Sequence, residues 1–327
     1  MMNKLTIIFA VNKSYTEKLL VELLVLFLIL FGTSFVLTWA VSRFRQRTIN
    51  LKLITHSAFL WTMSLSLVIS LGKVIYQQNI WSVQSKILQP IQTYNRKKSD
   101  YKANLDNSSR ADIANMVMRQ AVTGLDKQGF IAIPNCNILL PIYNDAYSVK
   151  GLNAGANYAN KSAVDPRGLR KPIMGQGNYG LAAHNFNDGL TGFSSLQKET
   201  NHNRPYLQEK QLQGSDWLNG KNILLADAQG IYNYKITGQT VVSPETVSVL
   251  DPTKTAEVTI ISCLFPSTNY RIITHGKLSK AYTWKNAPRK FVNEFNLKVK
   301  NTNAHVSWWN PGIEEGANGD KGGTKAN

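Results

Sequence analysis

The chain has 327 residues, 43% of them hydrophobic, and carries 37 Lys and Arg against 20 Asp and Glu. This length allows one ordinary core with appendages, and the excess of base suits an anionic partner such as a nucleic acid, a membrane face or a wall polymer. Two cysteines exclude a disulfide-rich scaffold, the five histidines show no metal-ligand spacing, and no nucleic-acid-binding signature is present, so we expect no metal, cofactor or nucleic-acid partner.

Two uncharged stretches near the N-terminus predict membrane-spanning helices. They cover residues 23–40 and 53–72, and about 20 apolar residues suffice for a helix to cross a bilayer. We expect helices at about 19–41 and 53–76, within a membrane anchor formed by residues 1–76. The alternatives are a cleaved signal peptide, for which no small-residue cleavage site is present, or a buried core helix.

The connection between these stretches predicts their orientation. It contains four basic residues and no acid, and cytoplasmic connections are enriched in Lys and Arg. We therefore expect the connection to lie in the cytoplasm and the rest of the chain to lie outside the cell. The basic residues are Arg43, Arg45, Arg47 and Lys52.

Residues 77–126 are expected to connect the anchor to a folded domain. The polar run 95–110 is typical of a solvated stalk, and residues 111–122 place Ile113, Met116 and Val117 at helical spacing. Such a segment would either extend the reach of the domain or pack as a cap on its side.

From Phe130 onward, short β-branched and apolar runs alternate with turn residues. This pattern predicts an all-β fold, a closed or nearly closed antiparallel barrel over residues 127–282. The segment 197–220 interrupts the pattern, and we interpret it as a tolerated surface loop rather than a substrate-side element. The expected strands are 129–133, 137–141, 178–183, 221–226, 231–243, 256–263 and 270–276, with short helices near 165–171 and 191–197.

Residues 283–327 are expected to form a C-terminal extension and a disordered tail. Residues 288–299 predict a short helix with Phe291, Phe295 and Leu297 inward. The Gly-rich, charged composition from Asn310 onward indicates disorder. The adjacent tryptophans, Trp308 and Trp309, would contact either the membrane or the barrel.

The stretch 258–278 carries the chemistry that the chain offers. Two β-branched runs flank turn residues, which predicts a hairpin that brings Cys263 and Arg271 together. A guanidinium beside a thiol favours the nucleophilic thiolate and can hold a developing oxyanion. The alternative is a buried structural cysteine and a solvated surface arginine.

A catalytic thiol needs a proton partner, and imidazole is the natural one. His56 borders a membrane stretch, and His202 and His305 lie in the insertion and the tail. His275 follows Arg271 by four residues, about 13 Å along a strand. His184 ends an apolar strand at a turn, where active-site residues of barrels tend to lie.

Several segments resemble those of class A sortases, in the order and spacing of that family. The resemblance covers roughly residues 127–282 and implies an eight-stranded sortase-type β-barrel. A single membrane span is usual in the family, so the second apolar stretch is a departure. The matching segments are TIISC with Arg271 on the next strand (259–271), GNYGLAAHN (177–185), FIAIPNCNILLPIYN (130–144) and VVSPETVSVLDPT (241–253).

The resemblance implies a role for each site residue. Cys263 would be the nucleophile, His184 the general acid and base, and Arg271 the group that stabilises the substrate carbonyl or oxyanion. Two supporting positions depart from the family: Ala183 replaces Gly, and Ser262 replaces Thr but keeps a hydroxyl and a backbone N–H. The second cysteine, Cys136, is interpreted as a packing residue.

The implied activity is transpeptidation. Class A sortases cleave LPXTG sorting signals of secreted proteins between Thr and Gly and transfer the acyl group to an amine of the peptidoglycan precursor lipid II. The expected location is the cell membrane, with the catalytic domain on its extracellular face. The alternatives are a membrane-tethered cysteine peptidase or hydrolase and a non-catalytic wall-binding barrel.

Overall fold

The computed structural model describes residues 4–44, 51–77, 79–305 and 315–316, with side chains described from residue 24 onward. The chain divides into two compact units, Met1–Ile80 and Trp81–Asn327.

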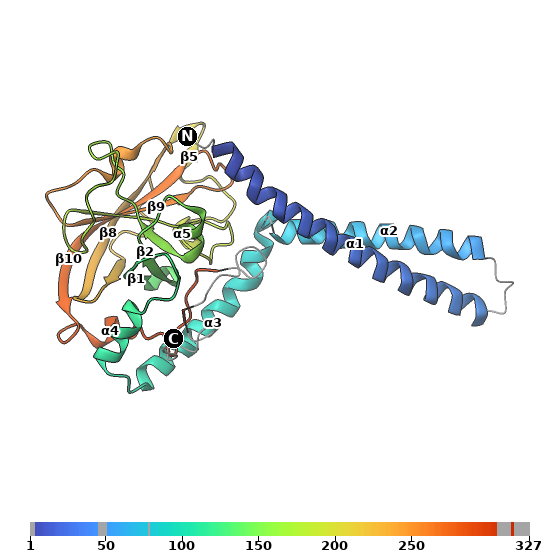
Figure 1. Cartoon of the computed structure of the whole chain (residues 1–327), viewed down its shortest axis with the longest axis horizontal. Helices are drawn as coiled ribbons and strands as arrows, with labels where there is room; N and C mark the ends of the chain where they lie inside the picture. The colour runs from blue at the N-terminus through green and yellow to red at the C-terminus, as the bar shows by residue number, and fades with distance from the viewer. Residues whose placement is uncertain (1–3, 45–50, 78, 306–314, 317–327) are drawn as a thin grey trace. The chain divides into compact units, whose positions relative to one another are not determined.

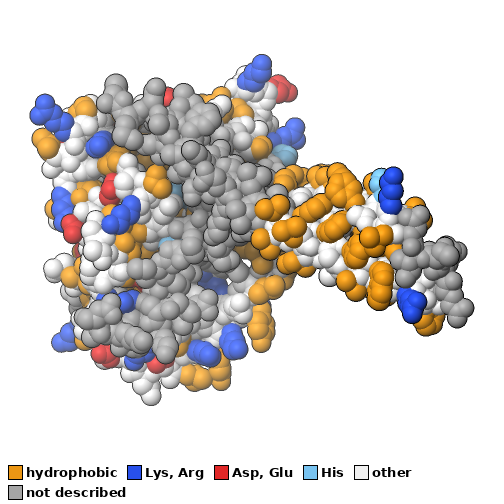
Figure 2. Space-filling view, turned by 45° about the vertical axis from the view of Figure 1, so that its right-hand side comes forward, with side chains coloured by type: hydrophobic (Ala, Val, Ile, Leu, Met, Phe, Trp, Pro, Cys, Tyr) orange, Lys and Arg blue, Asp and Glu red, His pale blue; other side chains and the backbone are white. Residues whose placement is uncertain are grey.

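The first unit contains the two apolar helices expected from the sequence, α1 (Lys4–Phe44) and α2 (Leu51–Gln77). They pack along each other, with the rings of Phe27 and Phe59 edge to face at 6.1 Å. The segments Leu24–Phe44 and Leu51–Tyr76 are each long and apolar enough to cross a membrane. Figure 2 shows hydrophobic side chains over much of the surface of these helices.

The second unit is built on a closed barrel of eight strands, which confirms the predicted fold (Figure 1). Around the barrel the strands follow the order β1-β2-β3-β4-β9-β10-β8-β7. A separate hairpin is formed by β5 (Leu207–Gln208) and β6 (Gln211–Leu212). The barrel strands are β1 (Lys127–Ile133), β2 (Ile138–Tyr143), β3 (Ala156–Tyr158), β4 (Asn178–Ala182), β7 (Asn222–Ala226), β8 (Gly230–Val242), β9 (Glu257–Cys263) and β10 (Arg271–Thr283).

The barrel is not purely antiparallel, contrary to the expectation from the sequence. β2 pairs with β3, and β4 pairs with β9, in parallel register. Strands of similar direction need a connection that crosses over from one end to the other. The chain between β4 and β9 makes this crossover through the strands β7 and β8.

Side chains on opposite faces of the strands form two separate hydrophobic cores. The barrel interior is filled by fully buried side chains such as Ile131, Leu140 and Ile260. The opposite faces of β1 and β7 carry Phe130 and Leu224, which pack with the helices outside the barrel in a second cluster. These helices are α4 (Arg110–Met118) and α6 (Arg289–Asn293).

The polar run 95–110 is largely exposed, as expected of a solvated segment, but it is helical over most of its length. Most of it belongs to a long helix, α3 (Val83–Leu105), whose Ala103 is buried. α4 follows, with Ser109 and Asp112 forming a capping box at its start. Ile113 and Val117 of α4 are fully buried, so this helix packs as a cap on the barrel.

Short elements account for the other local differences. The expected helix 165–171 is irregular, with a single turn at residues 166–167, and the expected helix 191–197 contains only the 3-10 turn η3 (Ser194–Leu196). β3, the β5–β6 hairpin and the helix α5 (Val149–Ala154) were not expected. The remaining 3-10 turns are η1 (Ile80–Ser82), η2 (Pro134–Cys136) and η4 (Val247–Leu250).

The C-terminal extension is more ordered than its composition indicates. α6 is shorter than the expected helix, but Phe291, Phe295 and Leu297 are buried as predicted. Trp308, Trp309 and most of the tail from Asn310 lie outside the described residues. Within that tail Glu315 is described and buried, which corrects the prediction of disorder at this position.

Glu315 is buried because it has two polar partners inside the fold. Its carboxylate accepts hydrogen bonds from Lys127 Nζ and from the hydroxyl of Tyr143. Burial lowers the pKa of Lys127 to about 8, although the charge of Glu315 acts in the opposite direction. Composition alone misses such a contact, because it depends on a partner almost 190 positions away.

Candidate active site

Cys263 is the last residue of β9, and Arg271 is the first residue of β10. The two strands are antiparallel, and Cys263 and Arg271 are direct cross-strand partners. Cα atoms of such partners lie about 4.5–5.5 Å apart. The connecting turn is closed by a hydrogen bond from Leu264 N to Tyr270 O at 3.1 Å. The predicted hairpin is therefore confirmed.

His184 approaches Cys263 from the other side of β9. The parallel register of β4 and β9 aligns Ala182 with Ile261, and Ala183 N donates to Ile261 O at 3.3 Å. Continuing this register by two residues aligns His184 with Cys263. Parallel strands end at the same edge of a sheet, so the ends of β4 and β9 bring the imidazole and the thiol to one rim of the barrel.

His275 lies elsewhere. It is paired with Thr259, four residues before Cys263, and its Nε2 is 2.9 Å from Thr240 Oγ1. Of the two histidines considered from the sequence, the strand register brings only His184 beside the thiol.

Burial controls the protonation of the pair. The thiol of Cys263 is half-buried, and burial raises its pKa while the positive charge of Arg271 lowers it. Burial also lowers the pKa of His184 to about 4. The ring of His184 packs edge to face against Phe186, with centroids 5.5 Å apart. At neutral pH the resting site therefore holds a neutral thiol and a neutral imidazole.

Arg271 is anchored above the turn. Its Nη1 donates to the carbonyl oxygens of Thr268 at 2.8 Å and Tyr270 at 3.0 Å. These bonds fix the direction of a planar donor group whose charge reaches the thiol.

The supporting residues lie on different faces of their strands. Ser262 shares the inward face of β9 with Val258 and Ile260 and is only 2% exposed. Since strand side chains alternate, its hydroxyl lies on the face opposite the Cys263 thiol. Ala183 is buried at the end of β4. Cys136 is buried in the barrel core, where burial raises its thiol pKa to about 12, which confirms it as a packing residue.

Two buried amides that the sequence analysis did not single out tie the histidine strand to the cysteine strand. Asn185 Nδ2 donates to Cys263 O at 2.8 Å and to Gln197 Oε1 at 2.9 Å. Gln197 in turn accepts from Phe265 N at 3.0 Å and donates to Phe265 O at 2.6 Å. The only feature of the sequence that could have identified Asn185 as part of the site is that it directly follows His184. These hydrogen bonds of Asn185 and Gln197 fix the backbone that follows His184 and the backbone that follows Cys263.

The segment 197–220 is largely exposed, as expected of a surface loop, but a few buried residues anchor it to the barrel. Tyr206 is fully buried with Leu264 and Ile272, and its hydroxyl donates to Gln239 Oε1 at 2.8 Å. Asn203 Oδ1 accepts from Ser267 N at 3.3 Å. The segment therefore packs against the turn between Cys263 and Arg271.

The C-terminal extension supports the loop that follows His184. Asn303 Nδ2 donates to Leu190 O at 2.8 Å and to Gly192 O at 3.0 Å, while its Oδ1 accepts from Leu139 N at 2.9 Å. Phe193 N, one residue beyond Gly192, donates to His184 O at 2.8 Å. Asn303 thus links β2 to the backbone of the histidine.

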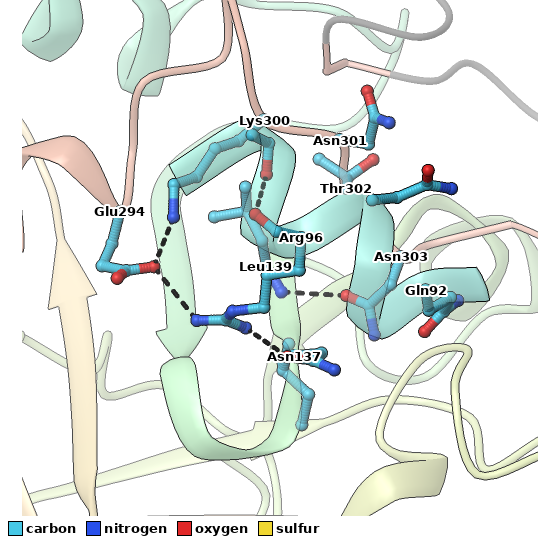
Figure 3. A pocket seen from close by; sticks show the side chains of 12 residues that line it. Gln92, Arg96, Asn137, Leu139, Glu294, Lys300, Asn301, Thr302 and Asn303 are labelled. Atoms are coloured by element: carbon cyan, nitrogen blue, oxygen red, sulfur yellow. Dashed lines mark hydrogen bonds and ion pairs between the residues drawn. The ribbon is translucent and has the colours of Figure 1, made fainter. Parts of the chain in front are cut away.

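A polar cavity of about 260 Å³ lies beside Asn303, between α3 and the C-terminal extension. Figure 3 shows Arg96 between Glu294 and Asn137, with Lys300 also directed at Glu294. Asp100 also pairs with both Arg96 and Lys300, so two cations and two acids neutralise one another, and we interpret the cavity as a structural contact between α3 and the C-terminal extension. Within the described ranges, no group of three His, Cys, Asp or Glu could hold a metal ion.

Comparisons with known proteins identify relatives of the barrel sequence. A family profile described as Sortase domain matches residues 131–279. Sortase A of Streptococcus agalactiae serotype III (strain NEM316) is 28% identical over 234 residues, which cover 70% of this chain and 84% of that protein. Sortase A of Listeria monocytogenes serovar 1/2a is 28% identical over 194 residues, covering 56% and 75%.

Solved structures also match. Listeria monocytogenes sortase A has 26% identity and a TM-score of 0.39, and the match covers 52% of this chain and 96% of that chain. Sortase C from Clostridium perfringens SM101 has 21% identity and a TM-score of 0.35, covering 58% and 89%.

Proposed function

This chain belongs to the sortase family of cysteine transpeptidases, and we propose that Cys263, His184 and Arg271 are its catalytic residues. The observation that carries the proposal is the register of β9, which has Arg271 opposite Cys263 on one side and β4, leading to His184, on the other. A nucleophile, a proton carrier and a fixed cation are the groups that acyl transfer from a peptide requires.

In the first half-reaction, Cys263 passes its thiol proton to the neutral His184 imidazole, and the resulting thiolate attacks the carbonyl carbon of the Thr–Gly bond in an LPXTG signal. Arg271 stabilises the negative charge that develops on the carbonyl oxygen. The C–N bond then breaks, and the His184 imidazolium gives its proton to the leaving glycine amine. The product is a thioester between the substrate threonine and Cys263.

In the second half-reaction, an acceptor amine attacks the thioester. Its proton passes to His184, and the Cys263 thiolate leaves as the new amide forms. A wall-precursor amine, as in lipid II, is the acceptor that we propose. The Ser262 hydroxyl lies on the inward face of β9, away from the thiol, so we assign stabilisation of the oxyanion to Arg271.

The chain is associated with the membrane through α1 and α2, and we propose that the barrel lies on the extracellular face. The basic connection between the helices supports this orientation. A reporter fused after Ser42 should be cytoplasmic and one fused after Asn95 exterior. Finding both on one side would reduce the two helices to a single span and leave the orientation to be redrawn.

The test of the activity is the intact mass of the full chain in detergent after incubation with an LPXTG peptide, against a scrambled peptide. We expect an acyl adduct on Cys263 with the LPXTG peptide only, and amide product when an oligoglycine amine is added. Hydrolysis alone, even with excess amine, would make the protein a membrane-tethered cysteine hydrolase. No adduct with any peptide would leave a non-catalytic wall-binding barrel.

A further inference from the structure

Helix α3 has an unusual arrangement of polarity. Its apolar side chains point outward, whereas the side chains that face the barrel unit are largely polar. The outward residues recur at intervals of four, three, seven and four, which aligns them along one face of the helix. We call them the α3 stripe: Ile87 (51% exposed), Ile91 (52%), Tyr94 (67%), Tyr101 (67%) and Leu105 (62%).

Polar contacts hold α3 in this orientation. Near its start, Ser85 Oγ donates to Asp188 O at 2.8 Å. Near its middle, Arg96 Nη1 donates to Asn137 Oδ1 at 2.7 Å, as Figure 3 shows. The inward face is thus occupied by specific hydrogen bonds, and rotating the helix to bury the stripe would break them.

Lysines flank the stripe, and one of them, Lys98, interrupts it. Lys86, Lys97, Lys98 and Lys102 are all exposed. Asp100 is the one acidic residue in α3, and its carboxylate is paired with Lys300 and with Arg96 at 3.5 Å. The exposed face of α3 therefore combines an apolar stripe with uncompensated positive charge.

The position of α3 in the chain keeps its start close to the end of α2. α2 ends at Gln77 and α3 begins at Val83, so residues 78–82 separate them. Such a link can extend at most about 20 Å, at roughly 3.5 Å per residue. If α2 spans the bilayer, the first turn of α3 cannot be far from the headgroups.

From these observations we infer that the α3 stripe lies in the interface of an anionic phospholipid bilayer. Apolar side chains on such a helix enter the boundary of the acyl region, tyrosines prefer the headgroup level, and flanking lysines pair with lipid phosphates. The inference rests on membrane insertion of α2, which is a part of the proposed function.

The alternative to a bilayer is that a second copy of the chain covers the α3 stripe. Two α3 helices packed by this face would bring Lys98, which lies within the stripe, and the flanking Lys97 and Lys102 close to their counterparts. No unpaired acid of α3 could offset that repulsion. A lipid surface supplies the missing negative charge, so the charge pattern favours the bilayer.

Docking of α3 would also act on the catalytic site. The bond from Ser85 to Asp188 joins α3 to the loop that follows His184. A helix lying on the bilayer would hold this loop, and with it the rim of the barrel, at a fixed height above the lipid.

The inference can be tested on the full chain in nanodiscs. The background is Cys263→Ala, because Cys136 is buried and inert. One variant adds Tyr94→Cys and the control adds Thr255→Cys, an exposed position two residues before β9; each carries an environment-sensitive fluorophore. Quenching by doxyl-labelled lipid is measured in phosphatidylcholine, with and without about 30% phosphatidylglycerol.

We expect quenching at position 94 to exceed that at position 255 by at least about threefold in the anionic discs. Combined Lys97→Glu, Lys98→Glu and Lys102→Glu substitutions should reduce it, as should removal of the anionic lipid. Equal, weak quenching at both positions would overturn the inference. So would a disulfide between two Tyr94→Cys chains, which would identify a second copy as the occupant.

A measurement on the unsubstituted chain guards against effects of the variants. Backbone amides of α3 should exchange more slowly with deuterium in anionic than in neutral discs, while those of β9 should not change. Identical exchange of α3 in both lipids would contradict the inference. Failure of the chain to insert into any disc would instead count against the proposed membrane anchor.

Discussion

The two neighbours of β9 supply the site in different ways. On the β10 side, Arg271 follows Cys263 by eight positions (263 to 271) and reaches it through one tight hairpin. On the β4 side, His184 precedes Cys263 by 79 positions (184 to 263) and reaches it through a parallel pairing. The cation is thus placed by local geometry, whereas the proton carrier depends on long-range contacts.

The long-range side is held by side-chain hydrogen bonds to its backbone. Asn185 ties the residue after the histidine to the cysteine carbonyl, and Asn303 ties the following loop to β2. A hairpin has its register set by its own turn. A parallel pair has no such turn, which explains why polar side chains fix the end of β4. The predictions below test this difference.

The largest effect is expected at the residue that both sides share. Cys263→Ala should abolish cleavage and the acyl adduct, since no other described group beside His184 and Arg271 can form the thioester. Cys136→Ala is the matched control and should retain both. Intact mass and product chromatography give the measurement, and an adduct surviving in the Cys263→Ala chain would remove it as the nucleophile.

The hairpin side is tested by Arg271→Lys. We expect a loss of about 10²- to 10³-fold in kcat/KM, because an ammonium cannot replace the planar donor at the oxyanion. The same exchange at the exposed Arg167 should have no effect. Near-normal turnover of the Arg271→Lys chain would exclude the guanidinium from the mechanism.

The long-range side is tested by Asn185→Asp, which keeps the shape but turns a donor toward two carbonyl acceptors into a carboxylate. We expect kcat to fall by about 10- to 100-fold with a smaller change in KM, because the histidine backbone shifts relative to the thiol. Asn185→Gln should not restore the bond geometry.

The control for this variant lies at the other end of the same strand. Asn178 Nδ2 also donates to two carbonyl oxygens, those of Val249 at 2.9 Å and Asp251 at 3.0 Å. Asn178→Asp should reduce the melting temperature comparably but leave kcat nearly unchanged. Equal losses of kcat in the two variants would make Asn185 a residue of general stability only.

The smallest effect concerns pH. The reactive form needs an ionised thiol and a protonated imidazole, and burial opposes both. With the His184 pKa at about 4 and the Cys263 pKa raised, the rate should show a broad bell, its acid limb near pH 4 and its alkaline limb above the ordinary thiol range.

The two limbs of the pH profile report on different residues: the acid limb on His184 and the alkaline limb on Cys263, whose pKa depends on Arg271. Arg271→Gln removes the charge that lowers the Cys263 pKa, so the alkaline limb should move to higher pH while the acid limb stays. The measurement is the residual rate of the variant from pH 3 to pH 11, a range of about eight units around the two pKa values. Movement of the acid limb alone would contradict the assignment of the limbs.

The sequence by itself determined the parts of this protein that depend on near neighbours. Length and apolarity define α1 and α2, β-branched runs define most barrel strands, and the turn after Cys263 defines the hairpin with Arg271. Helical spacing likewise identified the buried residues of α4. Each of these features arises within a window of about 20 residues, where periodicity and turn chemistry act.

Only the tertiary structure decided which strands lie side by side. The pairing of β4 with β9 is parallel; from the residues alone His184 was favoured over His275 by its position at a strand end, and only the family resemblance made a catalytic role the better interpretation. Burial of Gln197, Tyr206 and Glu315 was missed because a polar or irregular segment is buried only when distant groups satisfy its hydrogen bonds. Those distant partners leave no local pattern, so the folded chain alone reveals them.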